Sequence, residues 1–158
     1  MSPDTGVTRL AGDPGSPFEG RYGFSRVVRA GNFVSVGGTT STGPDGMVLG
    51  ATPYEHTVEV LRKIEHELGR AGASLAEVIQ TRVYVTDISR ADEVGRAHGE
   101  ALGETRPLMT MVEVSALIDP RMMVERRTSL PPRGRCPTPS PTRWSSGRAW
   151  WSDRRDGT

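Results

Sequence analysis

The residues best suited to chemistry in this chain are one glutamate and two arginines. Glu125 follows an apolar run, and a carboxylate there could orient water or transfer a proton. Arg82 and Arg106 could each bind a substrate carboxylate through two parallel hydrogen bonds. Simpler interpretations stay open, because a solvated glutamate at a strand end and ordinary surface ion pairs would explain the same residues.

Metal binding and nucleophilic catalysis find little support in the residue spacing. His56, His66 and His98 lack ligand spacing with one another or with a cysteine. The single cysteine, Cys136, lies in an atypical C-terminal segment, so neither a cysteine nucleophile nor an internal disulfide is expected. The glycine-rich stretch 37–46 lacks the ending and the following helix of a phosphate-binding loop. We therefore expect no metal and no cofactor.

Hydrophobic periodicity predicts the elements that position these residues. Strands are predicted at 24–29, 32–36, 79–87 and 108–116, and a further strand starts at 122. Apolar residues at three- and four-residue steps predict helices at 54–71 and 89–102. The order β-β-α-β-α-β-β favours an α+β fold, with a mostly antiparallel sheet and both helices packed on one face. The first 20 residues are rich in Gly, Pro, Asp and Ser and are assigned no element.

The predicted strand 108–116 carries two unlike faces. Met109, Met111 and Glu113 point one way, because side chains alternate along a strand. This face mixes apolar surface with a carboxylate, which suits a subunit interface or a pocket at one. With helices on only one side of the sheet, we expect oligomerisation. Met109 and Met111 are then expected to line a ligand site beside Glu125.

Composition divides the chain at Glu125. Residues 1–125 hold 17 acidic and 12 basic residues, a net charge of −5, whereas residues 126–158 hold eight Arg and two Asp. The second segment has five prolines and one leucine, too little apolar surface to offset the entropy of ordering. We interpret 1–125 as the folded domain and 126–158 as an aberrant Arg/Pro/Ser-rich tail, disordered or translated out of frame. The break predicts that the last strand stops early, which would expose a sheet edge and weaken an oligomer.

The sequence also indicates where the protein works and with what partners. No stretch has the length of a membrane-spanning helix, no secretory signal is present, and a lone cysteine suits a reducing compartment. We therefore expect a cytoplasmic protein with a small-molecule ligand and no membrane association. A net charge of −5 without a basic stripe argues against nucleic acid as a partner of the domain. A nucleic-acid-binding arm is an alternative for the tail, but its arginines are scattered.

Several short motifs, in their order and spacing, resemble the RidA/YjgF family, also labelled endoribonuclease L-PSP. The matching motifs are Gly31-Asn32, Gly37-Gly38, the run Thr81–Asp87, the run Val112–Leu117, and Val124-Glu125. The resemblance extends from about Phe18 to Glu125. It implies a chorismate-mutase-like α+β fold, a homotrimer with three clefts between subunits, and cofactor-free hydrolysis of reactive enamine/imine intermediates to ketoacids and ammonia.

The resemblance also implies a site, and most of its positions differ in this chain. The acidic residue is kept as Glu125, the expected catalytic group. The arginine that binds the substrate carboxylate in the family becomes Met109, and Arg106 lies three residues earlier. The remaining family positions fall on Gly37 for a serine, Phe24 (or Tyr22) for an aromatic hydroxyl, and Gly95 for a helix asparagine.

Of three functions considered, a ribonuclease rests only on the family label, and the net charge of −5 argues against it. The other two stay open. The first is a deaminase, a hydrolase acting on an atypical substrate, with Glu125 as the catalytic residue. The second is a non-catalytic ligand-binding or regulatory trimer, which the loss of the arginine favours. In either case the residues expected to contact the ligand are Phe24, Gly37, Met109, Met111 and Arg106.

Overall fold

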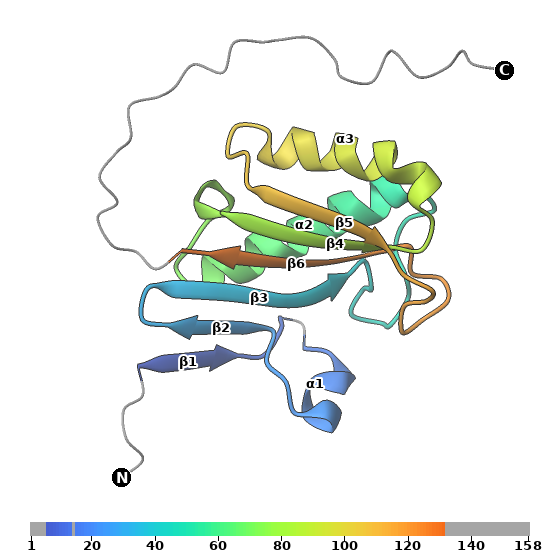
Figure 1. Ribbon diagram of the computed structural model, residues 1–158. Coiled ribbons are helices and arrows are strands. Elements are labelled where there is room, and N and C mark those ends of the chain that lie inside the picture. The colour runs from blue at the N-terminus through green and yellow to red at the C-terminus, as the bar shows by residue number, and fades with distance from the viewer. Residues whose placement is uncertain (1–5, 14, 132–158) are drawn as a thin grey trace, which may run out of the picture.

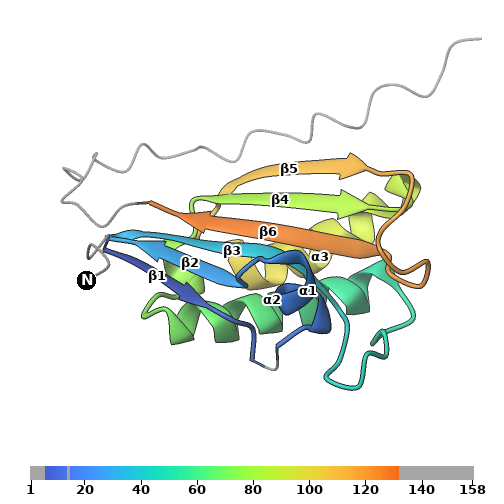
Figure 2. The same cartoon turned by 90° about the horizontal axis from the view of Figure 1, so that it is seen from below.

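One sheet with helices on a single face forms the framework of the protein (Figures 1 and 2). The structure is a computed structural model that describes residues 6–13 and 15–131. The strands are β1 (Val7–Leu10), β2 (Val27–Ala30), β3 (Phe33–Thr40), β4 (Gln80–Val85), β5 (Leu108–Glu113) and β6 (Val124–Leu130). The helices are α1 (Pro17–Tyr22), α2 (Pro53–Arg70) and α3 (Ala91–Leu102), with 3-10 turns at Leu75–Glu77 and Ile88–Arg90.

The six strands follow the order β1-β2-β3-β6-β4-β5. Every neighbouring pair is antiparallel except β4 and β5, which are parallel and are joined through α3. The prediction of a mostly antiparallel α+β fold with its two main helices on one face is therefore confirmed. Edge strands are β1 and β5, while β3, β6 and β4 lie in the middle of the sheet (Figure 1).

Helix α2 supplies the largest covering of the sheet. The side chain of Thr52 accepts a hydrogen bond from the Glu55 N–H, and proline follows at the first helical position, so the start of the helix is well defined. The face of α2 that covers the sheet buries Leu61, Ile64 and Leu68, and burial of each such side chain contributes about 1.5–3 kcal/mol. Val58, which follows the same apolar spacing, is 45% exposed.

Strand β6 runs through the centre of the sheet, and its length corrects the predicted end at Glu125. It continues to Leu130 and pairs with β3 on one side and with β4 on the other. Burial alternates along it, with Val124, Arg126, Thr128 and Leu130 all facing the helices. The expected exposed edge is therefore wrong for 126–130, because backbone pairing on both sides holds this segment despite its composition. The rest of the expected tail, 132–158, lies outside the described residues.

The N-terminal segment contains structure that the sequence pattern did not predict. Strand β1 extends the sheet by pairing with β2, and α1 is capped at its start by Ser16 and Glu19 in a reciprocal capping box. Gly23 ends α1 in a left-handed conformation with φ of 70°. These elements were missed because four residues of strand and six of helix give too short a periodic signal.

Two apolar clusters fill the space between the sheet and the helices, and polar side chains separate them. The larger cluster centres on α2, β2 and β3, and the smaller one on Val83, Val85, Val94 and Val124. Between the clusters, Arg126 is 0% exposed, and its Nε and Nη1 have no hydrogen-bond partner among the described residues. Its Nη2 lies 3.4 Å from the hydroxyl of Thr81, and burial lowers the arginine pKa to about 10.

Two histidines, one buried and one half-buried, are held without charge in or beside this interior. His56 is 0% exposed; its Nδ1 accepts from the Met123 N–H at 3.3 Å and lies 3.1 Å from the Ser41 hydroxyl, while its Nε2 lies 3.2 Å from the Gly50 carbonyl. These contacts require a neutral ring with its proton on Nε2, and burial lowers the pKa. Burial, with the positive charge of Arg126, lowers the pKa of His98 to about 4.

We expect the protein to lose stability as the pH falls from 6.5 to about 4. The depressed histidine pKa values mean that the unfolded chain binds protons first in this window, so acid favours unfolding. Urea denaturation at pH 7.5, 6 and 5 measures the effect, and His98→Gln should flatten the dependence. His66→Gln, at an exposed histidine of α2, is the control and should leave the slope unchanged. An equally steep slope in His98→Gln would contradict the assignment.

Candidate functional site

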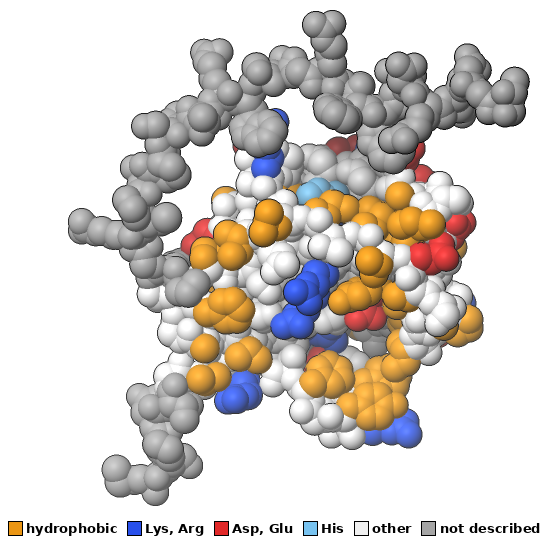
Figure 3. All heavy atoms as spheres, viewed as in Figure 1, with side chains coloured by type: hydrophobic (Ala, Val, Ile, Leu, Met, Phe, Trp, Pro, Cys, Tyr) orange, Lys and Arg blue, Asp and Glu red, His pale blue; other side chains and the backbone are white. Residues whose placement is uncertain are grey.

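The face of the sheet opposite the helices presents polar and apolar side chains to solvent (Figure 3). Strand register places Ser35 of β3 beside Ser129 of β6, and Tyr84 of β4 beside Glu125 of β6. Side chains paired in this way point to the same side of a sheet, so these residues share the open face. Figure 3 shows basic side chains near the middle of this face and a hollow with acidic atoms at its floor, bordered by apolar side chains.

Glu125 is the most unusual charged group on this face. Its carboxylate lies directly over the backbone of Gly38, where a methyl group would stand 2.2 Å from Glu125 Oε1. Burial raises the pKa of Glu125, and the positive charge of Arg26 only partly opposes this. Within the described residues no hydrogen bond or ion pair reaches the carboxylate. Such a half-buried acid without a partner is typical of proton-transfer sites.

An irregularity in β3 creates the space for this carboxylate. The register between β3 and β6 shifts between Val36 and Thr39, so Gly37 and Gly38 form a bulge. The Gly37 N–H donates to the Arg26 carbonyl at 2.8 Å, and the Thr39 hydroxyl donates to the Gly37 carbonyl at 3.0 Å. The Gly-Gly pair in the sequence thus marks the place where the side chain of Glu125, from β6, lies over the backbone of β3.

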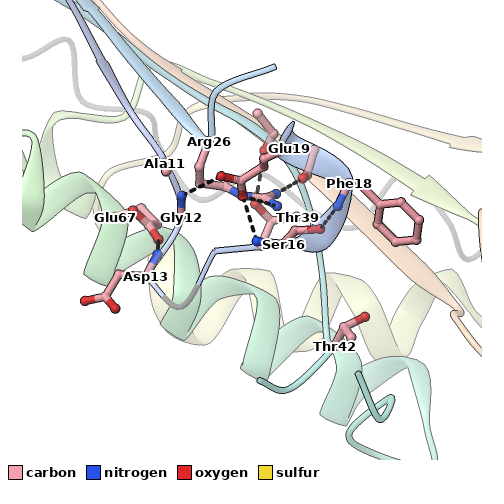
Figure 4. A network of polar contacts seen from close by, with 12 residues as sticks. Ala11, Gly12, Asp13, Ser16, Phe18, Glu19, Arg26, Thr39, Thr42 and Glu67 are labelled. Carbon is pink, nitrogen blue, oxygen red and sulfur yellow. Dashed lines mark hydrogen bonds and ion pairs between the residues drawn. The ribbon is translucent and has the colours of Figure 1, made fainter. Parts of the chain in front are cut away.

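Arg26 holds the strand backbone beside Glu125 and was missed by the sequence reasoning. One guanidinium nitrogen donates to the Gly38 carbonyl, and another forms an ion pair with Glu19 at 3.3 Å (Figure 4). The same guanidinium lies 5.9 Å from the centre of the Phe24 ring. Glu19 also accepts from the Gly12 and Ser16 N–H groups, which ties α1 to the site. Only the three-dimensional arrangement brings Arg26 to Gly38, so spacing alone gave no signal.

Lys63 of α2 holds the end of β3 from the helix side of the sheet. Its ammonium group donates to the carbonyls of Thr40 at 2.9 Å and Thr42 at 2.8 Å. Burial, followed by the charge of Arg26, lowers the pKa of this lysine. Because Thr40 pairs with Glu125 in the sheet, the contacts of Lys63 and Arg26 fix the backbone on both sides of the carboxylate.

The predicted site residues are only partly brought together. Phe24 and Gly37 lie near Glu125 through Arg26 and the β3 bulge. Met109 and Met111 pair with Thr81 and Val83, whose side chains are buried under the helices, so the expectation that they share a face with Glu125 is wrong. The reason is the register of β5 against β4, which puts Leu108, Thr110 and Val112 on the open face in place of the methionines.

Arg106 lies at the other end of β5 from Glu125. It precedes the strand, whereas Tyr84, the partner of Glu125, pairs with Val112 six residues later, a distance of about 20 Å along the strand. Its side chain donates to the Gly103 carbonyl at 3.3 Å, and its φ of 49° is the only positive value among the described non-glycine residues. Arg106 therefore closes the turn after α3 and, within one chain, does not reach the Glu125 site.

The described part of the chain was also searched for metal-binding groups and for membrane-spanning helices. No group of three or more His, Cys, Asp and Glu side chains within 6–13 and 15–131 is placed to bind a metal ion. Over the same residues, no helix combines the length and apolar character needed to cross a membrane.

We expect Gly38→Ala to displace the Glu125 carboxylate while leaving the fold intact. The added methyl group would overlap Oε1, and the glutamate side chain can rotate away into solvent at little cost. The pKa of Glu125 should then fall toward 4.5, which carboxyl-carbon NMR titration measures. Gly37→Ala is the matched control, since its methyl group would meet nothing closer than 3.4 Å. Equal pKa values in the two variants would contradict the described placement.

Comparisons with known proteins match this architecture. The sequence profile of the family described as endoribonuclease L-PSP matches residues 16–128. An uncharacterised protein of Streptomyces coelicolor, SCO2049, is 37% identical over 110 residues, which are 70% of this chain and 82% of that protein. A RutC family protein of Pyrococcus abyssi is 33% identical over 95 residues, 60% of this chain and 75% of that protein.

A solved structure extends the match to three dimensions. The crystal structure of Rv2704 from Mycobacterium tuberculosis, a member of the YjgF/YER057c/UK114 family, is 46% identical with a TM-score of 0.71. The alignment covers 78% of this chain and 98% of that one. These features define a chorismate-mutase-like α+β fold and a class of proteins that handle small molecules. This chain belongs to the RidA/YjgF, or endoribonuclease L-PSP, family, as its motifs predicted.

Proposed function

We propose that this protein is an enamine/imine deaminase, a hydrolase that acts on an atypical small metabolite. The observation that carries the proposal is the half-buried, unpaired carboxylate of Glu125, whose raised pKa suits a group that alternately accepts and donates a proton. It stands at the position where family members keep an acidic residue. A rigid setting supports this role, because Arg26 and Lys63 hold the backbone on either side.

The chemistry requires protons to move to and from one carboxylate. Water adds to the carbon of the protonated C=N bond, and Glu125 takes a proton from that water as the new C–O bond forms. The carboxyl group then returns this proton to nitrogen. As the C–N bond breaks and ammonia leaves, Glu125 takes the proton of the new hydroxyl group, so that the C=O bond of the product forms, and this proton passes to the released ammonia. No step needs a metal or an organic cofactor, because the carboxylate accepts and returns each proton and water supplies the oxygen.

A second candidate function is a non-catalytic ligand-binding or regulatory trimer. The observation that favours it is Met109, which stands where catalytic members of the family have the arginine for the substrate carboxylate. Loss of a charge-assisted hydrogen bond removes about 1.5–3 kcal/mol of ligand binding. On this alternative, Glu125 would bind a donor group of a ligand without turning it over.

One assay separates the two candidates. Imines are generated with an amino-acid oxidase, trapped with semicarbazide, and ketoacid release is measured with and without the protein. The proposed deaminase should accelerate ketoacid formation and lower the semicarbazide adduct for at least one amino acid in a broad panel. Absence of acceleration across the panel, together with saturable ligand binding, would leave the binding trimer in its place.

The proposed assembly is a homotrimer in the cytoplasm, with a cleft at each contact between subunits. Its support is the open face of the sheet, where Leu108 is 72%, Val112 42% and Phe33 37% exposed. Apolar side chains grouped on a sheet face are typical of an interface. We expect light scattering to give three times the 17.1 kDa chain mass, and Val112→Asp to lower it. A monomeric wild type would contradict the trimer.

A further inference from the structure

We propose that Arg82 and Arg127 together form a binding site for an oxyanion, the carboxylate or phosphate group of a small ligand. The two residues are direct partners in the antiparallel pairing of β4 with β6. Both side chains therefore leave the sheet on the open face, next to each other.

Neither guanidinium has a partner in the part of the protein that the structure describes. Over the described residues, no hydrogen bond, ion pair or ring contact reaches the side chain of Arg82 or of Arg127, whereas Arg62, Arg70, Arg90 and Arg121 all form ion pairs. Gln80 and Ser129 complete a hollow of about 80 Å³ around the two arginines. The amide and hydroxyl supply further donors at its wall.

Two like charges placed directly opposite each other destabilise a strand pair. An anion between them would relieve that repulsion, and each guanidinium could donate two parallel hydrogen bonds to its oxygens. Carboxylate and phosphate fit such a pair because their oxygens match the spacing of the guanidinium N–H groups. In an oligomer that covers this face, the two arginines need an anion even more, because charges without a counter-charge are costly to bury.

The pair of arginines lies two residues along the strands from Glu125 and its partner Tyr84. Arg127 follows Glu125 by two residues on β6, so their side chains leave the same face about 7 Å apart. Tyr84, paired with Glu125, stands beside Arg82 on the neighbouring strand in the same way. A small ketoacid imine bound through its carboxylate would extend toward Glu125. This placement rests on the proposed function, whereas binding of the anion does not.

Isothermal titration and thermal shift at low ionic strength test the site with inorganic phosphate and with pyruvate as probes. We expect saturable binding of at least one probe and a rise in the melting temperature. Arg82→Gln and Arg127→Gln should each weaken binding by about tenfold or more, while folding is retained because each relieves a like-charge pair. Arg9→Gln is the control, since Arg9 lies on the same face on the edge strand β1 and removes an equal charge.

The outcomes distinguish this site from the proposed function. Absence of saturable binding of either probe to the wild-type protein would overturn the inference. So would equal affinities in the Arg82, Arg127 and Arg9 variants, because binding would then reflect net charge alone. Binding that is lost in both paired variants, in a protein without imine hydrolysis, would support the anion site and reject the deaminase.

Discussion

Replacing Arg126 with methionine should stabilise the protein by about 3 kcal/mol, which corresponds to a rise in melting temperature of about 10 °C. The arginine is 0% exposed, and within 6–13 and 15–131 its Nε and Nη1 have no partner, so folding removes water from its charge without replacing all the lost hydrogen bonds. Methionine follows the same path through the interior with an unbranched apolar side chain. Chemical denaturation of wild type and variant at pH 7.5 measures the change.

The neighbouring residue provides the matched control. Arg127→Met makes the same substitution on the same strand, but at an exposed side chain, so its effect should stay below about 1 kcal/mol. A second readout is the pKa of His98, which should rise in Arg126→Met because a nearby positive charge disappears. Equal stability changes in the two variants, with an unmoved His98 pKa, would show that Arg126 does not lie in the interior.

The burial of Arg126 also bears on the compositional break at Glu125. Of the four residues of β6 that face the helices, Val124 and Leu130 are apolar, whereas Arg126 and Thr128 have buried polar atoms without partners in the described part of the chain. Polar side chains thus occupy core positions immediately after the point where the composition changes. Translation out of frame from 126 stays a prediction, which resequencing of the gene tests directly; the anion site of Arg82 and Arg127 belongs to the chain of this sequence in either case. An intact reading frame through codon 126 would reject it.

The fold could be predicted because its signals are long and periodic. The apolar stripe of α2 extends over 18 residues, and the apolar–polar alternation of β4 extends over 6. In each case a single apolar face packs against the rest of the protein. Strand β6 could not be predicted beyond Glu125, because its membership depends on backbone hydrogen bonds to β3 and β4 and not on its side chains. Local composition carries no information about such pairing.

The site was predictable only where one residue carries the signal. Glu125 could be singled out from its place after an apolar run, whereas Gly37-Gly38 lay beyond the predicted strand 32–36 and was singled out only through the family resemblance. Arg26 could not, because its role depends on contacts with Gly38 and Glu19 that bring three elements together. The face of Met109 was predicted wrongly for a related reason. The alternation along a strand defines two faces, but it does not say which of them meets the helices.

Glu125→Gln should reduce imine hydrolysis by about 10²–10⁴-fold, the range typical for loss of a general acid or base. Glutamine keeps the shape of the side chain and its position over Gly38, so stability should change little, and it cannot accept or release the proton. In the wild-type protein the rate should fall as the pH drops through the raised pKa of Glu125, because the carboxylate form takes the proton from water.

The pH profile separates this role from a structural one. Glu125→Gln should lose the acidic limb together with the rate, whereas Glu113→Gln, at an exposed carboxylate at the end of β5, should keep both. Gly38→Ala should fall between them, since it retains the carboxylate but displaces it. A Glu125→Gln variant with wild-type turnover and an unchanged acidic limb would assign the proton transfer to another group. The order wild type, Gly38→Ala, Glu125→Gln therefore tests both the identity of the acid and the need for its position.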